Sequence, residues 1–363
     1  MPTRVRSFAK INLGLAIGPV QVSGFHALTT MYQTIALADE VTVSVVSTGV
    51  TRKIKCTSNS ARVPVDGRNT AVQMIEKALL SLRIEAEIHV HIEKKLPVQG
   101  GLGAGSANAA AALIALEAEL NQSLPAAERL EIAAKVGSDV PLFLIGGSVL
   151  GINRGEEVYP LPDLPQMPCI VVVPPVGVST PQAFSDWDKC TKNDGFNAQK
   201  RAIKRNLDAF SDIEKNNEDT LTPTPDSDRL KTLSRVLSSA FVPTGASGVL
   251  RRSQGLAGNP LLALVRTGIE NDFEQVVFPM YPSLSALKRE LAGPDSGDGS
   301  AVYAALSGSG SALFGLYRDA RDAEIARERV EKFAAISQPG TQVLMTNTLT
   351  RDEYWRQMVI EDQ

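Results

Sequence analysis

The chain has 363 residues, of which 43% are hydrophobic and 21% are charged, and its formal net charge is −3. These values are ordinary for a globular protein, and they lack the basic surplus of nucleic-acid-binding proteins. The three cysteines lie far apart, which indicates neither a disulfide framework nor a CxxC metal site. The N-terminal residues show no signal-peptide pattern, and no run reaches the roughly 18 apolar residues of a membrane span. We therefore expect a cytoplasmic protein with no membrane or nucleic-acid partner.

The spacing of apolar residues predicts both strands and helices in the first half of the chain. Alternation predicts strands over residues 5–17, 41–45 and 88–92. Helical spacing predicts helices over residues 70–82 and 126–136, and an Ala-rich helix directly follows a glycine-rich loop.

The predicted strand 5–17 places its apolar and polar residues on different faces. We expect one face to carry Val5, Ile11, Leu13, Leu15 and Ile17. Lys10 and Asn12 belong to the other face, so their side chains point the same way.

Clustered prolines at residues 160–168 predict a boundary between domains covering residues 1–165 and 166–363. The second domain opens on a buried strand at 169–173, and its polar segment at 186–260 is predicted to be an insertion. The elements then predicted are a helix (283–291), a strand (301–306), a Gly/Ser turn (307–311), a strand (312–317), a helix (319–335) and a strand (342–346). Strands and helices mix without strict alternation, which indicates an α+β class.

The glycine-rich loop is the most informative segment of the sequence. It reads Gly100, Gly101, Leu102, Gly103, Ala104, Gly105 and Ser106. Glycines permit close approach of a ligand, and the start of the following helix offers free N–H groups, so the loop suits a phosphate. Ser106 stands where a Walker A loop needs lysine and where a dinucleotide fingerprint needs its third glycine, which excludes both of those motifs. A tight turn that merely lets the helix pack is the alternative.

Three further features have a structural and a functional interpretation. Asp139, in a Gly-Ser-Asp-Val-Pro segment, is either a cap or a catalytic carboxylate. The turn at 307–311 is either a simple hairpin turn or a second backbone nest for phosphates. His26 follows an aromatic residue in a loop and is a candidate for ligand recognition, whereas His89 and His91 lie on the solvent face of a strand.

Taken in order, these segments resemble the GHMP kinase superfamily of small-molecule kinases. The order is Ala-Lys-Ile-Asn-Leu, Gly-Phe-His, Leu-Pro-x-x-x-Gly-Leu-Gly-x-Gly-Ser-x-Asn-Ala-Ala, Gly-x-Asp-Val-Pro and Ser-Gly-Ser-Gly. The likeness covers residues 6–185 well and 271–316 more sparsely. Within the superfamily it is closest to the kinases of the non-mevalonate isoprenoid pathway that phosphorylate a cytidylylated sugar alcohol.

The resemblance implies an N-terminal ribosomal-S5-like α/β domain and a C-terminal ferredoxin-like domain. It also implies ATP with Mg²⁺ as cofactors and a small-molecule alcohol as substrate. We expect a monomer or weak homodimer. A kinase acting on mevalonate or homoserine is an alternative, as is a non-catalytic relative that binds a metabolite. The Gly-Phe-His segment and Asn108 favour the cytidylylated substrate, and the presence of both Lys10 and Asp139 favours an active enzyme.

The resemblance also implies a role for individual residues. Lys10 would contact the substrate hydroxyl and the transferring phosphate, and Asp139 would be the base. The ATP-binding residues would be Asn69, Pro97, Gly100, Gly101, Leu102, Gly103, Ala104, Gly105, Ser106 and Ser309, with Mg²⁺ near Ser106. The substrate-binding residues would be Asn12, Phe25, His26, Asp139 and Phe184. Of these, Phe25, His26 and Phe184 would hold the cytosine, with the base between the two phenylalanine rings.

The loop departs from the family pattern at two positions. Ala107 replaces the usual second serine, so Ser106 carries the one hydroxyl there. Ala104 stands where the family often has glycine, which makes the loop slightly stiffer.

Overall fold

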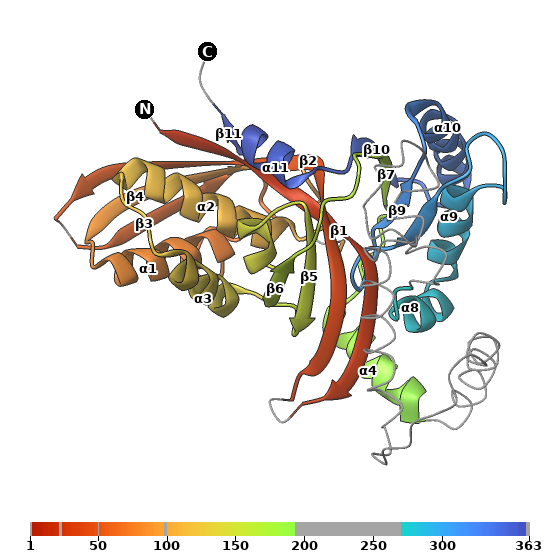
Figure 1. Cartoon of the computed structure of the whole chain (residues 1–363), viewed down its shortest axis with the longest axis horizontal. Helices are drawn as coiled ribbons and strands as arrows, with labels where there is room; N and C mark the ends of the chain where they lie inside the picture. Colours follow the sequence, from red (N-terminus) through yellow and green to blue (C-terminus); the bar gives the residue numbers. More distant parts are fainter. Residues whose placement is uncertain (1, 22–23, 50, 98–99, 193–269, 361–363) are drawn as a thin grey trace, which may run out of the picture.

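The computed structural model describes residues 2–21, 24–49, 51–97, 100–192 and 270–360. Two sheets, each covered by helices, make up this part of the chain (Figure 1). The larger sheet has seven strands, and its central path runs in the order β11-β1-β2-β4-β3. Its members are β1 (Thr3–Val20), β2 (His26–Thr48), β3 (Lys53–Ser58), β4 (Ala86–Glu93), β5 (Ser148–Asn153), β6 (Glu157–Pro160) and β11 (Val359–Ile360).

Strands β1 and β2 form a long antiparallel hairpin that positions much of the site described below. Strand β2 also pairs with β4 at one end and with β5 at the other, and β6 extends the sheet beyond β5. Strand β3 runs parallel to β4. The helices of this half are α1 (Thr70–Leu82), α2 (Ala104–Leu120), α3 (Ala126–Val136) and the 3₁₀ turn η1 (Pro141–Leu144). Helix α2 packs on β1 and β2 and is buried on nearly all sides, which its alanines permit.

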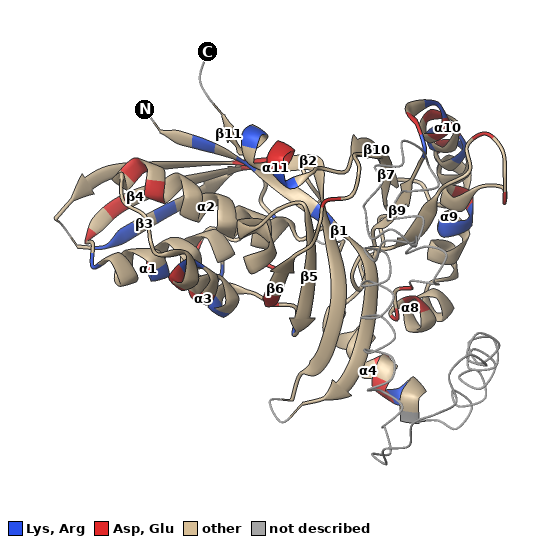
Figure 2. Ribbon diagram, viewed as in Figure 1, with Lys and Arg blue, Asp and Glu red and all other residues tan. Residues whose placement is uncertain are grey.

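The second sheet is antiparallel, with the strand order β10-β7-β9-β8. Its strands are β7 (Pro168–Val173), β8 (Tyr303–Leu306), β9 (Leu313–Leu316) and β10 (Gln342–Asn347). The helices of this half are α4 (Thr180–Lys192), α8 (Glu274–Met280), α9 (Pro282–Ala292) and α10 (Ala320–Ser337). Acidic and basic residues alternate along α10, whereas the lower part of the β1–β2 hairpin carries none (Figure 2).

Strand β1 joins the hydrophobic cores of the two halves. Val5 and Phe8 pack in the N-terminal core, beneath helices α1 and α2. Ile11 packs in a second core with residues of β7 and β9, and Ile17 packs in a third with α8, α9 and α10. The predicted single apolar face of this strand is therefore wrong, because the strand crosses from one layer to the next and its pairing with β2 shifts register three times.

The predicted α+β class is confirmed, and most predicted elements appear within a few residues of their expected bounds. Residues 186–192 of the predicted insertion belong to helix α4, and residues 193–260 lie outside the described residues. The division at residue 165 stays a prediction. No helix in the described ranges combines the length and apolarity needed to cross a membrane.

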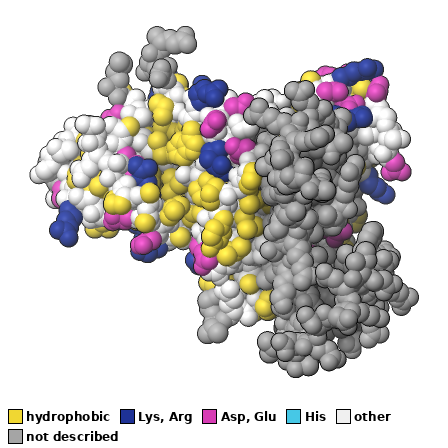
Figure 3. Space-filling model, viewed as in Figure 1, with side chains coloured by type: hydrophobic (Ala, Val, Ile, Leu, Met, Phe, Trp, Pro, Cys, Tyr) yellow, Lys and Arg dark blue, Asp and Glu magenta, His cyan; other side chains and the backbone are white. Residues whose placement is uncertain are grey.

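The C-terminal segment returns to the N-terminal sheet, which the sequence patterns did not indicate. Helix α11 (Arg351–Met358) starts with a capping box made by Thr350 and Glu353, and β11 then pairs with β1. Hydrophobic side chains gather on the middle of the face seen in Figure 3. Within α11, Tyr354 is 1% exposed, and its hydroxyl donates to the Phe143 carbonyl in η1 at 2.6 Å.

We expect Tyr354→Ala to lower the free energy of unfolding by about 3–5 kcal/mol, the usual cost of removing a buried aromatic side chain. Tyr354→Phe should cost about 1–3 kcal/mol, because it leaves a buried carbonyl without its donor. Denaturant unfolding measures both values. Equal stability of the three proteins would show that α11 does not hold the N-terminal core together.

Candidate active site

Lys10 and Asp139 form an ion pair at the junction of the two halves. Lys10 Nζ lies 3.3 Å from Asp139 Oδ2, and the Lys10 side chain is 3% exposed. Lys10 is on β1, and Asp139 lies in the short segment between α3 and η1. The sequence separated these two residues by more than a hundred positions, and the structure brings them together as the resemblance implied.

A chain of hydrogen bonds fixes the amine of Lys10 from the other side. Lys10 Nζ donates to Asn12 Oδ1 at 2.6 Å, and Asn12 Nδ2 donates to Thr30 Oγ1 at 2.8 Å. Thr30 in turn donates to the Gly14 carbonyl. The expectation that Lys10 and Asn12 point the same way is confirmed. Thr30 was not predicted, since it reaches the site through the pairing of β1 with β2.

Tyr32 of β2 is a second contact of Asp139 that the sequence patterns did not reveal. Its hydroxyl donates to Asp139 Oδ1 at 3.0 Å. Burial, and then the nearby Asp139 carboxylate, raise the pKa of Tyr32 well above its usual value. The hydroxyl therefore stays protonated at physiological pH and acts as a donor.

The glycine-rich loop runs past Lys10 into helix α2. The Leu102 carbonyl accepts a hydrogen bond from the Lys10 backbone N–H at 3.0 Å. Gly103 has φ +71°, and an added Cβ would lie 2.9 Å from Phe143 Cζ and 3.1 Å from Lys10 Cγ. Glycine is therefore required at this position, both for its backbone conformation and for its lack of a side chain. The first N–H groups of α2 begin directly after it.

The Gly/Ser turn after β8 packs directly against this loop. An added Cβ at Gly101 would lie 2.0 Å from the Ser307 carbonyl oxygen, and Ser307 Oγ donates to the Gly101 carbonyl at 2.9 Å. Gly100 accepts from the Ala312 N–H at 3.0 Å. Asn271 holds the turn from behind by donating to the Leu306 and Gly308 carbonyls. The two glycine-rich segments thus form one backbone surface beside Lys10.

A cavity of about 380 Å³ opens on the outer side of the glycine-rich loop. Its lining includes the following residues of the predicted ATP-binding set: Asn69, Pro97, Gly101, Leu102, Gly103, Ala104, Gly105 and Ser106. Gly100 and Ser309 do not line it. Ser309 instead shares a 2.7 Å hydrogen bond with Thr180 at the start of α4. Asn69 caps α1 by accepting from the Ala71 N–H, so its amide shapes the cavity wall.

Lys94 also lines this cavity and was not predicted. It pairs with the fully buried carboxylate of Asp39, which accepts further hydrogen bonds from the Lys95 and Leu96 N–H groups. These contacts hold the strand end after β4 against β2. The arrangement places a cation in the wall of the cavity.

The predicted cytosine-binding residues gather near the tip of the β1–β2 hairpin and helix α4. The rings of His26 and Phe184 stack with centroids 5.1 Å apart, and Phe184 packs edge-on against Phe273. His26 Nδ1 lies 3.0 Å from the Gly18 carbonyl, and Nε2 lies 3.2 Å from Asp188 Oδ1. In this structure His26, rather than an open space, covers one face of Phe184.

Phe25 is 56% exposed, and the Arg154 guanidinium lies 5.3 Å from its ring centroid. It is not paired with Phe184 in the described structure, so the aromatic sandwich stays a prediction. Arg154 and Asp188 were missed because they come from the β5–β6 turn and from a segment whose polarity indicated a loop.

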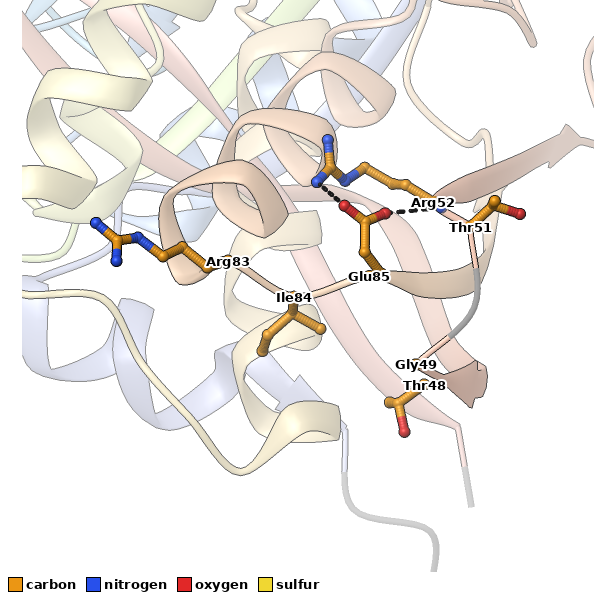
Figure 4. A pocket seen from close by; sticks show the side chains of 7 residues that line it. All are labelled: Thr48, Gly49, Thr51, Arg52, Arg83, Ile84 and Glu85. Atoms are coloured by element: carbon orange, nitrogen blue, oxygen red, sulfur yellow. Dashed lines mark hydrogen bonds and ion pairs between the residues drawn. The ribbon is translucent and has the colours of Figure 1, made fainter.

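A second hollow lies at the far end of the N-terminal sheet, away from these residues (Figure 4). Its lining is Thr48, Gly49, Thr51, Arg52, Arg83, Ile84 and Glu85. Arg52 and Glu85 bind each other there at 2.7 Å. This pair lies at the surface, with the Glu85 side chain 52% exposed, whereas Lys10 is buried, so the hollow is a weaker candidate for the active site.

The described residues contain no cluster of three potential metal-ligating His, Cys, Asp or Glu side chains. Ser106 stands in the first turn of α2, close to Gly137. Magnesium bound to nucleotide phosphates takes most of its oxygens from the phosphates and water, and it needs few from the protein. The Ser106 hydroxyl is chemically suited to that limited role.

Two family models match segments of this chain. Residues 69–147 match the family model for the GHMP kinases N terminal domain, and residues 250–336 match that for GHMP kinases C terminal. The second match begins inside the predicted insertion.

Two relatives match most of this chain. A 4-diphosphocytidyl-2-C-methyl-D-erythritol kinase of Solibacter usitatus is 34% identical over 87% of this chain and 81% of its own. A kinase of the same name from Gloeobacter violaceus is 31% identical over 88% of this chain and 87% of its own.

Solved structures show the same fold at lower identity. A crystal structure of 4-(cytidine 5'-diphospho)-2C-methyl-D-erythritol kinase aligns with a TM-score of 0.61 and 23% identity, covering 95% of this chain and 98% of that one. The homoserine kinase of Cytophaga hutchinsonii aligns with a TM-score of 0.62 and 19% identity, covering 96% of this chain and 95% of its own. The fold is thus common to kinases with different substrates. The sequence identity to the two relatives above extends over most of this chain, and it shows that the chain belongs to the 4-diphosphocytidyl-2-C-methyl-D-erythritol kinase family of the GHMP kinases.

Proposed function

We propose that this chain transfers the γ-phosphoryl group of ATP to a hydroxyl of 4-diphosphocytidyl-2-C-methyl-D-erythritol and forms the 2-phosphate, a step of non-mevalonate isoprenoid biosynthesis. The observation that carries the proposal is the Lys10–Asp139 pair beside the glycine-rich loop. The sequence similarity to a kinase of this name over most of the chain also supports it. Phosphoryl transfer depends mainly on positioning and on neutralising charge. The described residues are suited to both tasks.

Each group at the junction has a distinct part in this reaction. Asp139 accepts the proton of the attacking hydroxyl, as a general base. Lys10 faces both the hydroxyl and the transferring phosphate, and its charge offsets the negative charge that develops there. The N–H groups at the start of α2 and the glycine-rich backbone hold the phosphates. Mg²⁺ bound with ATP would add further neutralisation, and the Ser106 hydroxyl would help to hold it.

The alternatives have less support. The fold is shared with homoserine and mevalonate kinases, so it does not select among substrates. Similarity in sequence favours the cytidylylated alcohol, since relatives covering most of this chain carry that name. A non-catalytic relative would not need a buried lysine paired with a carboxylate beside a phosphate-binding loop.

A coupled ADP-release assay tests the proposal with three alcohols: 4-diphosphocytidyl-2-C-methyl-D-erythritol, mevalonate and homoserine. We expect turnover with the first and background rates with the other two. Equal turnover with mevalonate or homoserine would refute the substrate and leave the kinase assignment intact. ADP release that needs no alcohol would refute phosphoryl transfer to an acceptor.

We expect Asp139→Asn to lower kcat by about 10²–10⁴-fold, the usual effect of losing a general base, while the fold is retained. Asparagine keeps the shape of the side chain but does not accept the hydroxyl proton. Asp298→Asn, on an exposed loop where the carboxylate pairs with Arg321, is the matched control and should keep full activity. Near wild-type turnover of the Asp139 variant would remove it from the role of base.

We expect Gly103→Ala to weaken binding of a non-hydrolysable ATP analogue about tenfold or more, as measured by calorimetry. The added Cβ meets Phe143 and Lys10, and the left-handed backbone costs alanine about 1–3 kcal/mol. Gly67→Ala is the control, because a Cβ at Gly67 has open space around it and no positive φ. Unchanged affinity in the Gly103 variant would mean that the loop is a packing turn.

We expect Phe184→Leu to raise KM for the cytidylylated alcohol by about 5- to 100-fold, since stacking of one base on an aromatic ring contributes about 1–3 kcal/mol. Leucine keeps an apolar contact with Phe273 while removing the flat ring. Methylerythritol phosphate without the cytidylyl group is the control, and its much lower efficiency should not change in this variant. An equal loss with both substrates would show that Phe184 acts through the fold.

A further inference from the structure

Two groups from neighbouring strands each contact one oxygen of Asp139. Lys10 Nζ of β1 lies 3.3 Å from Oδ2, and the Tyr32 hydroxyl of β2 donates to Oδ1 at 3.0 Å. Tyr32 is 2% exposed. A carboxylate with an ion-pair partner at one oxygen and a hydrogen-bond donor at the other is held against rotation about its terminal bond, which orients the oxygen that meets the substrate.

Two glycines leave the space that the Tyr32 ring occupies. A Cβ added at Gly151 of β5 would lie 2.5 Å from Tyr32 Cε2, and one added at Gly155 would lie 2.5 Å from the Tyr32 hydroxyl oxygen. The same added Cβ at Gly155 would lie 3.9 Å from Asp139 Oδ1. The ring therefore fills a slot that two glycines leave open, and the slot ends at the carboxylate.

The hydroxyl meets Asp139 as a donor and not as an acceptor. An ionised carboxylate has no proton to give, so the phenol supplies the hydrogen of the 3.0 Å contact. Glu156, in the turn after β5, is a second carboxylate near this phenol and also disfavours its ionised form. A neutral phenol can therefore hold the carboxylate without placing a second cation beside Lys10.

We propose that Tyr32 is a positioning residue that fixes the Asp139 carboxylate so that Oδ2, the oxygen beside Lys10, takes the substrate proton. This inference rests on the proposed function. In the step, the substrate oxygen bonds to the γ-phosphorus as its proton passes to Asp139 Oδ2. The bond between the γ-phosphorus and the bridging oxygen breaks, and its electron pair leaves with ADP. Asp139 later returns the proton to solvent.

Tyr32→Phe tests the inference, because it removes the hydroxyl and keeps the ring in its glycine-lined slot. In single-turnover measurements with ATP and the cytidylylated alcohol, we expect the transfer rate to fall about 10- to 100-fold, the effect of one hydrogen bond to a charged group. KM for ATP and for the alcohol should change less than about twofold, because on this inference the hydroxyl acts through Asp139. Tyr159→Phe on β6, at a tyrosine that is 51% exposed, is the matched control and should behave as wild type.

The double variant with Asp139→Asn separates positioning from other roles. If Tyr32 acts through Asp139, removing its hydroxyl should add little to the loss already caused by Asp139→Asn. An equal loss in both backgrounds overturns the inference, as does an unchanged transfer rate. A raised KM for the alcohol at unchanged rate also overturns it, because Tyr32 would then contact the substrate. If the wild type uses mevalonate or homoserine instead, the proposed substrate fails, and the Tyr32 comparison is made with that acceptor.

Discussion

The buried ammonium group of Lys10 is the constraint on which the rest of the site depends. A charge with 3% exposure is strongly unfavourable unless it is paired and hydrogen-bonded. Asn12 supplies one partner from the same strand, and Asp139 supplies the other from the opposite side of the site. The position of Asp139 therefore depends on the segment between α3 and η1 as well as on Tyr32. The pairing that stabilises the buried Lys10 ammonium also holds the Asp139 carboxylate in place, and the backbone surface made by the two glycine-rich segments begins beside this lysine.

That backbone surface exists because two glycine-rich segments approach more closely than side chains allow. The carbonyl of Ser307 occupies the place where a Cβ of residue 101 would be, and Gly103 leaves room for the stem of Lys10. One segment belongs to the N-terminal half and the other follows β8, so the site forms only when the two sheets are packed together. Strand β1, which takes part in all three cores, provides that packing. The packing that stabilises the interface between the two sheets therefore also assembles the site.

The sequence predicted the parts of this arrangement that depend on local pattern. Residue spacing predicts that Lys10 and Asn12 share a strand face and that residues 70–82 form a helix, and the glycines predict the turn at 307–311. All three features are observed. Tyr32 and Thr30 could not be found in this way, since their positions depend on the register of β1 with β2 and on its irregular steps. The return of β11 to β1 depends on contacts between chain ends, which no local pattern records.

The contacts of His26 and Phe184 suggest how substrate selectivity can depend on individual side chains as well as on the fold. The His26 ring stacks on Phe184, and both of its nitrogens have partners, one in the Gly18 carbonyl and one in Asp188. Both partners are acceptors, so a base that binds His26 through Nε2 must exchange the contact with Asp188 for one of its own. Such an exchange favours a ligand whose hydrogen bonds fully replace those lost, because an unpaired buried group is costly. Under the proposed function, selectivity for one nucleobase would arise from this competition, whereas Lys10 and Asp139 would act on any alcohol that reaches them.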